Sequence, residues 1–451
     1  MASEVDVVVI GLGPGGESVA TKLAEAGLDV VGVDKHLVGG ECPYYGCIPS
    51  KMMIRAANLV AEAGRVDQMA GSAAVSSDWS PVARRIADEA TDHWNDKVAV
   101  DRLTAAGVTF VRGHGGLAGT RTVVVEGQTF RARKGVVLNT GTEPAVPPIP
   151  GLAGTPYWTN RDAIQVTDLP GSLAVVGGGS IGAELSQVFS RFGVQVSVLE
   201  VADRILALEE PESSTLVATV FAHEGIQVLT GITISSIEYG DGRFAVTTGD
   251  QVVSADKLLV AAGRRNNLAD VGLETVGLDP SMRVIDTDDL LRAGEGLWAI
   301  GDITGKGAFT HVSMYQAAIV VRDILGDEGP DADYRAVSRV TFTDPEVGSV
   351  GMTEKQARDN GLTVRVGFYE LPNSTRGWIH KAGNDGFIKL VEDADRGVLV
   401  GATSVGPSGG EVLSALSVAV HGRVPTDTLR SMIYAYPTFH RAIEAALADL
   451  H

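Results

Sequence analysis

The chain has 451 residues, which is too long for one ordinary hydrophobic core and suggests two to four domains. Hydrophobic residues make up 44% and charged residues 21% of the chain, a balance typical of globular rather than disordered proteins. The 56 acidic and 37 basic side chains leave a formal charge of −19, which disfavours nucleic acids and anionic membranes as partners.

No apolar run approaches the roughly 18 residues of a membrane span. The apolar stretch Val5–Ile10 also lacks the basic flank of a secretory signal, so we expect a cytoplasmic protein. Its only two cysteines, Cys42 and Cys47, are too few for a disulfide scaffold or a structural zinc site. Their number alone favours two small buried apolar side chains, but two cysteines alone in a reducing compartment also suggest a redox couple.

The N-terminal region has the pattern of a dinucleotide-binding unit. The predicted order of strand, glycine-rich turn, helix, strand and acid covers Val5–Ile10, the glycines Gly11, Gly13 and Gly16, a helix up to Gly27, Asp29–Val33 and Asp34. Such a spacing lets a phosphate approach the glycines at the start of the helix and places a carboxylate near a ribose.

The same pattern recurs in the middle of the chain. Its parts are a strand over Leu173–Val176, the glycines Gly177, Gly179 and Gly182, a helix to about Phe192, a strand over Val194–Leu199 and the acid Glu200. One such motif is a weak signal, but two in the full context predict two bound dinucleotides. Each helix N-terminus would offer unpaired N–H groups and partial positive charge to a pyrophosphate. Asp34 and Glu200 would accept hydrogen bonds from the two adenosine riboses.

The remaining chain divides by composition. A proline-rich segment, Pro144–Gly151, separates the two units and is typical of a crossing between domains. The last hundred or so residues have strand-like runs from about Val340 and predicted helices near Glu411–Val420 and Phe439–Leu450. This pattern predicts a third, α+β domain.

The segment that contains both cysteines carries a family resemblance. It reads Gly-Gly-Glu-Cys-Pro-Tyr-Tyr-Gly-Cys-Ile-Pro-Ser-Lys over residues 39–51. It resembles the redox motif of the class I pyridine nucleotide–disulfide oxidoreductases, which include dihydrolipoamide dehydrogenase, glutathione reductase and mercuric reductase. Further segments that resemble motifs of this family follow in the family's order: Asn139–Gly141, Ala261–Arg264, Gly301–Asp302 and Phe342–Glu346.

The resemblance implies an α/β fold with two Rossmann-like dinucleotide-binding domains, one for FAD and one for NAD, and an α+β C-terminal dimerisation domain. The implied domains are an FAD domain over residues 1–148 and 267–335, an NAD domain over 149–266, and a dimerisation domain over 336–451. A homodimer follows from the resemblance and not from composition.

The resemblance also implies roles for single residues. Cys47 would lie next to the flavin, and Cys42 would attack the substrate. Lys51 and Glu184 would pair beside the flavin. The remaining implied contacts are Gly141 and Asp302 with FAD, and Gly263 with NAD. Glu200 suits the free 2′-hydroxyl of NADH and repels the 2′-phosphate of NADPH, although Arg204 lies close enough in sequence to serve that phosphate.

One motif departs from the family pattern. Relatives carry His-Pro-Thr-x-x-Glu, in which the histidine protonates the departing thiolate, whereas this chain has Tyr436 and Arg441 at the two positions. Imidazole titrates near neutrality, whereas a phenol has a reference pKa of about 10 and is a poor base. A hydrogen bond from Tyr436, the charge of Arg441, or His440 one helical turn beyond Tyr436 are the alternatives for replacing the lost pair.

These features favour NADH-dependent reduction of a low-molecular-weight disulfide through Cys42 and Cys47. A substrate whose sulfur leaves easily, such as ergothioneine disulfide, fits the missing acid–base pair. The alternatives are a dihydrolipoamide dehydrogenase-like activity, a flavin-centred quinone or dye reductase with idle cysteines, and a redox-sensing flavoprotein. Mercuric reductase is disfavoured because no cysteine follows Cys47, whereas those enzymes have a C-terminal cysteine pair.

Overall fold

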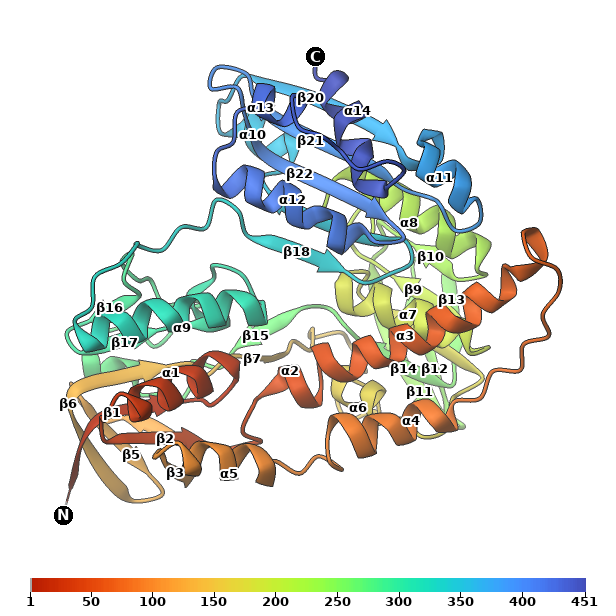
Figure 1. Ribbon diagram of the computed structural model, residues 1–451. Coiled ribbons are helices and arrows are strands. Elements are labelled where there is room, and N and C mark those ends of the chain that lie inside the picture. Colours follow the sequence, from red (N-terminus) through yellow and green to blue (C-terminus); the bar gives the residue numbers. More distant parts are fainter. Residues whose placement is uncertain (1) are drawn as a thin grey trace. The chain divides into compact units, whose positions relative to one another are not determined.

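The computed structural model describes residues 2–451 and divides into two compact units (Figure 1). The first unit consists of residues 2–49, 84–145 and 264–333, and the second of residues 50–83, 146–263 and 334–451. The chain therefore passes between the units several times, and helix α3 (Cys47–Gly64) begins in the first unit and continues in the second.

The first unit is built on one large sheet. Along its main path the strand order is β16-β17-β6-β1-β2-β3, in which β17, β6, β1, β2 and β3 run parallel and β16 is antiparallel to β17. The strands are β1 (Ser3–Ile10), β2 (Val30–Asp34), β3 (Thr109–Arg112), β4 (Gly115–Leu117), β5 (Thr122–Val125), β6 (Gln128–Leu138), β16 (Arg292–Gly294) and β17 (Leu297–Ala299). Strands β4 and β5 extend the sheet as an antiparallel pair beside β6.

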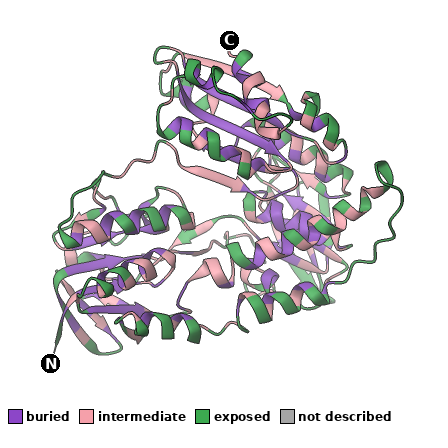
Figure 2. Ribbon diagram, in the orientation of Figure 1, coloured by how far each residue is buried: buried purple, intermediate pink, exposed green. Residues whose placement is uncertain are grey.

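Alternation along β1 produces two hydrophobic cores. Val7 and Val9 face one side, where they pack with helices α1 (Pro14–Glu25), α5 (Lys97–Ala105) and α9 (Thr310–Leu325). Val8 and Ile10 face the other side and pack with β5 and the segment around Leu273. Both sides of β1 are buried, and α1 and α9 lie side by side (Figures 1 and 2). A strand buried on both faces explains the continuous valine run.

The second unit contains a smaller parallel sheet of order β10-β9-β8-β14. A separate antiparallel sheet, β11-β12-β13, packs against it through Phe244 and Val246. The strands are β8 (Ser172–Val176), β9 (Gln195–Leu199), β10 (Gln227–Leu229), β11 (Ile234–Gly240), β12 (Arg243–Thr248), β13 (Gln251–Ala255) and β14 (Lys257–Val260); the helices are α6 (Asn160–Ile164), α7 (Ser180–Arg191) and α8 (Pro211–His223).

The C-terminal part of the second unit is an antiparallel sheet of order β18-β19-β22-β21-β20. Its strands are β18 (Ser338–Thr341), β19 (Glu346–Gly351), β20 (Val364–Glu370), β21 (Phe387–Asp393) and β22 (Val398–Gly406). Its helices are α10 (Glu354–Asp359), α11 (Thr375–His380), α12 (Gly409–His421), α13 (Thr426–Arg430) and α14 (Ala442–Ala448). Helices α12 and α14 pack on the sheet around Ile388 and Leu390, and α10 packs near Val391. Strand β21, next to the central strand β22, is buried along its whole length.

The remaining elements of the two units are short. They are α2 (Glu41–Tyr44), α4 (Ser80–Arg85), the paired strands β7 (Thr142–Pro144) and β15 (Arg264–Asn266), the π-helix η2 (Ile86–Ala90) and the 3-10 turns η1 (Val66–Gln68), η3 (Leu273–Val276), η4 (Gly301–Thr304), η5 (Leu371–Asn373) and η6 (Phe439–Arg441). No helix in residues 2–451 is long and apolar enough to cross a membrane.

The predicted fold class is confirmed, since both strand–turn–helix–strand units form parallel sheets and an α+β region ends the chain. One element differs from the prediction. The helix expected over Phe439–Leu450 begins only at Ala442, and a 3-10 turn precedes it. The predicted limits of the FAD, NAD and dimerisation domains stay predictions.

Candidate active site

The first glycine-rich turn joins β1 to α1 and lies under the end of β6. Gly11 has a φ of +92°, and a Cβ there would overlap the carbonyl oxygen of Asn139. A Cβ at Gly16 would overlap the carbonyl oxygen of Gly11, so this glycine lets the helix pack directly on the turn. Gly13 is the N-cap of α1, and no side chain within residues 2–451 caps that end. The helix therefore presents unpaired N–H groups, as a phosphate site requires.

Asp34 at the end of β2 holds this turn in place. Its carboxylate accepts hydrogen bonds from the backbone N–H groups of Leu12 and His36, each at 2.7 Å. Burial raises the pKa of Asp34 above its ordinary value, and these two bonds act against that rise. A buried carboxylate beside a phosphate-binding turn is the expected partner of an adenosine ribose.

The second turn repeats this arrangement between β8 and α7. Gly177 has a φ of +106°, and a Cβ at Gly182 would overlap the carbonyl oxygen of Gly177. Gly179 is the N-cap of α7, again with no side-chain cap among the described residues and with open space around it. Glu200 accepts from the N–H groups of Gly178 at 2.6 Å and Ala202 at 2.8 Å.

Arg204, the basic residue nearest to Glu200 in the following loop, is directed toward that loop. Its guanidinium donates to the carbonyl oxygen of Ala207 at 2.9 Å and to the carboxylate of Asp203 at 3.3 Å. These contacts commit two of its nitrogens to neighbours in the chain. Its buried Nε has no hydrogen-bond partner among the described residues, so Arg204 is only partly engaged by its neighbours.

Asp302, at the second predicted FAD motif, is part of a polar chain within the first unit. It accepts a hydrogen bond from the hydroxyl of Thr142 at 2.6 Å, and Thr142 accepts one from Arg264 at 2.6 Å. Arg264 also lies 3.5 Å from the carboxylate of Glu41, the residue before Cys42. Sequence reasoning did not find Thr142 or Glu41, because nothing in their local pattern marks them. The predicted residue Gly141 has a φ of +63° and directly precedes Thr142.

Next to Gly141 in sequence, the structure has a buried polar atom without a hydrogen-bond partner in residues 2–451. The hydroxyl of Thr140 is buried and has no hydrogen-bond partner among the described residues. Buried hydroxyls are normally paired, and an unpaired one calls for a ligand or water. Its position between Asn139 and Gly141 agrees with the predicted FAD motif.

The two cysteines lie in adjacent short elements of the redox segment. Cys42 is half-buried in α2, and Cys47 is exposed at the first residue of α3. The Sγ of Cys47 lies 3.7 Å from the hydroxyl of Thr310, the first residue of the 16-residue helix α9. A hydroxyl and a helix N-terminus both stabilise negative charge, so this surrounding favours a thiolate at Cys47.

Lys51 and Glu184 form the ion pair that the resemblance implied. The Lys51 Nζ lies 2.7 Å from the Glu184 carboxylate, which is almost completely buried. The other carboxylate oxygen accepts from the Phe342 N–H at 2.8 Å, and the Lys51 ammonium lies 4.6 Å from the Phe342 ring centroid. The pair is therefore fixed from three sides. Lys51 is also one turn beyond Cys47 in α3.

The motif around Phe342 is held by a second, buried ionic cluster. Asp344 binds Arg65 at 2.7 Å and Arg191 at 2.8 Å, and Arg191 also binds Glu224. Burial opposes ionisation of Asp344, but the charges of Arg191 and Arg65 outweigh it and keep its pKa below the usual range.

The C-terminal motif has no helix that joins its residues. Tyr436 is exposed and stands next to Pro437, whereas His440 belongs to the 3-10 turn η6 that follows an extended residue, Thr438. The expectation that His440 lies one helical turn beyond Tyr436 is therefore wrong. Instead, the Arg441 guanidinium lies 5.4 Å from the Tyr436 ring centroid, a cation–π contact. Arg441, one of the three predicted replacements, is thus in contact with Tyr436, another of them.

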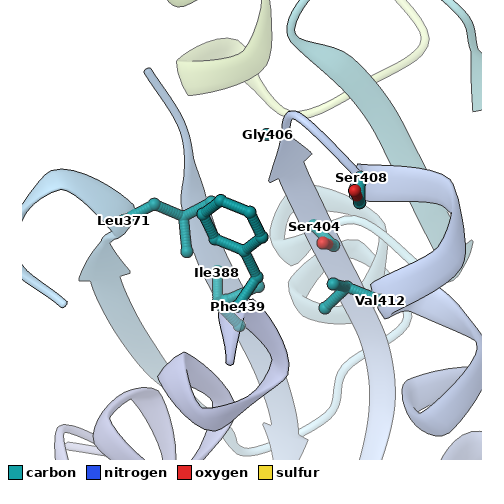
Figure 3. Close-up of a pocket in the computed structure, with 8 residues that line it drawn as sticks. Leu371, Ile388, Ser404, Gly406, Ser408, Val412 and Phe439 are labelled. Carbon is teal, nitrogen blue, oxygen red and sulfur yellow. The ribbon is translucent and has the colours of Figure 1, made fainter. Parts of the chain in front are cut away.

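Phe439 begins the 3-10 turn that precedes the terminal helix α14. Its ring points into a small apolar hollow between β21, β22 and α12, beside Leu371, Ile388 and Val412 (Figure 3). The hollow is too narrow to admit a water molecule, so it is a packing site for Phe439 and not a ligand site.

Comparison with known proteins decides the family. The family model described as pyridine nucleotide-disulphide oxidoreductase matches residues 5–317, and the model of its dimerisation domain matches residues 337–447. The chain belongs to the pyridine nucleotide-disulphide oxidoreductase family.

Relatives in this family align over nearly the whole chain. A dihydrolipoyl dehydrogenase of Chlamydia muridarum is 32% identical over 97% of this chain and 95% of its own length. A mercuric reductase of Staphylococcus aureus is 30% identical over 98% of this chain and 82% of its own. Among solved structures, the HOCl-induced flavoprotein disulfide reductase RclA from Escherichia coli is similar with a TM-score of 0.85, 26% identity and 99% of both chains covered.

The family membership confirms that the chain is an enzyme, a flavoprotein disulfide oxidoreductase that acts on a sulfur group with NAD(P)H. Use of FAD and a pyridine nucleotide follows from the family, and the dimerisation-domain match supports a homodimer. The residues fit these groups, because both glycine turns admit no side chain where the backbone comes closest, both helix starts lack a side-chain cap, and the Thr140 hydroxyl lacks a partner in residues 2–451.

Proposed function

We propose that this enzyme reduces a low-molecular-weight disulfide with electrons from NADH through the Cys42–Cys47 pair. The observation that carries the proposal is the contact of Cys47 with Thr310 at the start of α9. Cys47 also precedes Lys51 by one turn of α3. This surrounding stabilises one thiolate of the pair and leaves Cys42 to act on the substrate.

The exchange balances as follows. The Cys42 thiolate attacks one sulfur of the substrate disulfide, that S–S bond breaks, and the first product thiolate leaves with the electron pair. The Cys47 thiolate then attacks the Cys42 sulfur, releases the second product thiolate and closes the Cys42–Cys47 disulfide. When bound, FAD supplies the transfer of two electrons from NADH to this disulfide, which restores the dithiol.

The residues around the second turn support NADH as the donor. Glu200 places a carboxylate just after β9, where it would accept a hydrogen bond from the 2′-hydroxyl of an adenosine ribose and would repel a 2′-phosphate. Arg204 already binds Ala207 and Asp203. We infer that Gly177, Gly179, Gly182, Glu200 and Gly263 bind NADH, and that Gly11, Gly13, Gly16, Asp34, Gly141 and Asp302 bind FAD.

The C-terminal motif bears on the kind of disulfide. Tyr436 has a phenol where relatives have an imidazole, and its partner is the cation of Arg441. A phenol can donate a hydrogen bond to a departing sulfur, but as a class phenols are poorer acid–base groups near neutral pH than imidazoles. The proposed substrate therefore carries a sulfur that leaves without protonation. Ergothioneine disulfide is an example, because the ergothioneine released from it is a stable thione.

The proposed assembly is a homodimer in which Tyr436 approaches the partner subunit's Cys42. Large apolar side chains stand exposed on the C-terminal region of this chain, among them Ile433 at 99% and Trp378 at 75%. Cover by a partner subunit would remove these side chains from water, which supports an interface in this region. A cytoplasmic location stays a prediction.

The decisive experiment measures NADH consumption with a panel of disulfides and quinones. Wild type, Cys42→Ser and Cys47→Ser are compared, since the chain has no other cysteine. We expect one disulfide to turn over rapidly, Cys42→Ser to abolish that activity, and Cys47→Ser to retain half of the substrate as a mixed disulfide on Cys42. Mass spectrometry would detect that adduct.

The same experiment separates the rival functions. Turnover of quinones alone, unimpaired in Cys42→Ser, would identify a flavin-centred quinone reductase and reject the proposal. Fast turnover of lipoamide with no preference for thione-forming disulfides would retain the dithiol mechanism and reject the proposed substrate class.

A further inference from the structure

The turn formed by residues 92–94 has unusual backbone angles and contacts the redox segment, residues 39–51. Asp92, His93 and Trp94 have φ angles of 45°, 54° and 57°, so three consecutive residues other than glycine adopt the left-handed conformation. Residues other than glycine rarely adopt this conformation even at a single position, because the Cβ atom then crowds the backbone. Strain of this kind persists only where the surroundings enforce it, and it is common at functional sites.

The surrounding backbone holds this turn firmly. It follows the π-helix η2, two of whose carbonyl groups accept hydrogen bonds from residues of the turn and its start. The buried hydroxyl of Thr91 donates to the Ile86 carbonyl at 3.0 Å, and the His93 N–H donates to the Ala87 carbonyl at 2.8 Å. The left-handed geometry is therefore built into the hydrogen bonding of the segment.

The result of this geometry is two contacts with the redox segment. The Trp94 indole N–H donates to the carbonyl oxygen of Tyr44 at 3.2 Å, and Tyr44 lies between the two cysteines. The Asp96 carboxylate accepts from the Val38 N–H at 2.7 Å, just before the Gly39–Gly40 pair. Residues 92–96, which we call the clamp, thus bind the redox segment on both sides of Cys42.

Tyr44 shows how closely this part of the segment is enclosed. Its side chain is buried, which raises the pKa of its phenol, and the nearby charge of Asp96 adds to the rise. A Cβ at Gly46 would lie 3.2 Å from the Glu41 carbonyl oxygen, so the loop between the cysteines is also tightly folded on itself. A shift of the Tyr44 carbonyl would therefore move the backbone that spaces Cys42 from Cys47.

We propose that Trp94 is a positioning residue, which together with Asp96 holds the Cys42–Cys47 loop in the geometry in which its disulfide closes. A disulfide tolerates only a narrow range of distances between its two residues, so a loop held near that range raises the effective concentration of one thiol at the other. The inference rests on the proposed function, in which these cysteines form the redox pair.

The test is a redox titration that uses neither NADH nor substrate. Full-length, FAD-loaded protein is equilibrated in glutathione buffers, thiols are trapped by alkylation, and the Cys42–Cys47 disulfide is quantified by mass spectrometry. Trp94→Phe retains the ring but removes the donor. One hydrogen bond changes such an equilibrium about fivefold, so we expect the constant for disulfide formation to fall by about that factor.

Trp79→Phe is the matched control. Trp79 also donates its indole N–H to a backbone carbonyl, that of Val166 at 2.8 Å, but it is buried whereas Trp94 is half-buried, and it belongs to the second unit. We expect this variant to lose thermal stability and to retain the wild-type redox constant. Asp96→Ala, which removes the acceptor for Val38, should shift the constant in the same direction as Trp94→Phe.

Three results would overturn the inference: an unchanged constant in Trp94→Phe, an unchanged constant in Asp96→Ala, or an equal shift in Trp79→Phe. The two variants at the clamp act on different backbone groups, so failure of one to fold leaves the other as the test. Turnover that survives Cys42→Ser, with the titration shifted as expected, would reject the proposed function and retain the clamp.

Discussion

Glu200 makes with its glycine turn the same two backbone contacts that Asp34 makes with its own. Each carboxylate accepts from the residue after the first glycine and from the residue two positions beyond itself. The two binding units are thus repeated in their side-chain contacts as well as in their sequence pattern. Each acid both supports its turn and offers charge at the place where a ribose would lie.

Replacing Glu200 by glutamine should weaken NADH binding and reduce discrimination against NADPH. The amide has the shape of the carboxylate but lacks its negative charge, which strengthens a hydrogen bond to the ribose by about tenfold in affinity. The KM for NADH should therefore rise by about that factor. Steady-state kinetics with both nucleotides measures the effect. Asp203→Asn, at an exposed neighbouring acid, controls for the loss of charge, and an equal change in both variants would contradict a specific role of Glu200.

Removal of Lys51 should destabilise the protein through Glu184. In Lys51→Met the buried carboxylate keeps only the Phe342 N–H as partner, and because Lys51 is 33% exposed we expect a loss of about 1–3 kcal/mol in the free energy of unfolding. Chemical denaturation measures this loss.

The double variant Lys51→Met/Glu184→Gln should recover part of it, because no unpaired buried charge remains. Lys97→Met, in the exposed pair of Lys97 and Asp101, should change stability by less than about 1 kcal/mol. Additive losses in the double variant would show that the two residues are not coupled.

Restoring the family's acid–base pair should broaden the substrate range. The double variant Tyr436→His/Arg441→Glu introduces an imidazole with an ordinary pKa of about 6.5 and a carboxylate to orient it. We expect turnover of an aliphatic disulfide such as lipoamide to increase at least tenfold and to depend on pH near neutrality. The single variant Tyr436→His is the control. A pH profile that matches the wild type would show that this position does not reach the departing sulfur.

Asp344 should make stability sensitive to acid. Its pKa is lower in the folded protein than in the unfolded chain, so its contribution is complete above the unfolded value of about 3.9 and is lost as the pH falls through the folded value. Asp344→Asn should therefore be less stable than wild type at neutral pH, with a difference that narrows as the pH drops below about 4. Thermal melting across this range measures it. Asp427→Asn, at an exposed acid paired with Arg430, is the control and should change stability by less than about 1 kcal/mol at neutral pH.

Features that depend on neighbouring residues were predicted closely. The first strand was expected over Val5–Ile10 and forms as Ser3–Ile10, and the helix expected up to about Phe192 ends at Arg191. Glycine turns, apolar runs and helix starts depend on residues that are close in sequence, so the local sequence pattern is enough to predict them. The end of the chain is predicted less well, since a 3-10 turn over Phe439–Arg441 stands in place of the first helical turn and the half-buried Phe439 ring packs beside Ile388 and Val412.

Contacts between distant segments had no such local signal. Lys51 and Glu184 lie 133 positions apart and were paired only through the family resemblance. Trp94 and Tyr44, 50 positions apart, were not paired at all, since neither belongs to a repeating pattern or a motif. By itself the sequence determined where the chain turns, which faces are apolar and which residue types are available for redox chemistry. Which side chains meet around the cysteines was decided only by the tertiary structure, because long-range packing selects one hydrogen-bond partner among many that are locally equivalent.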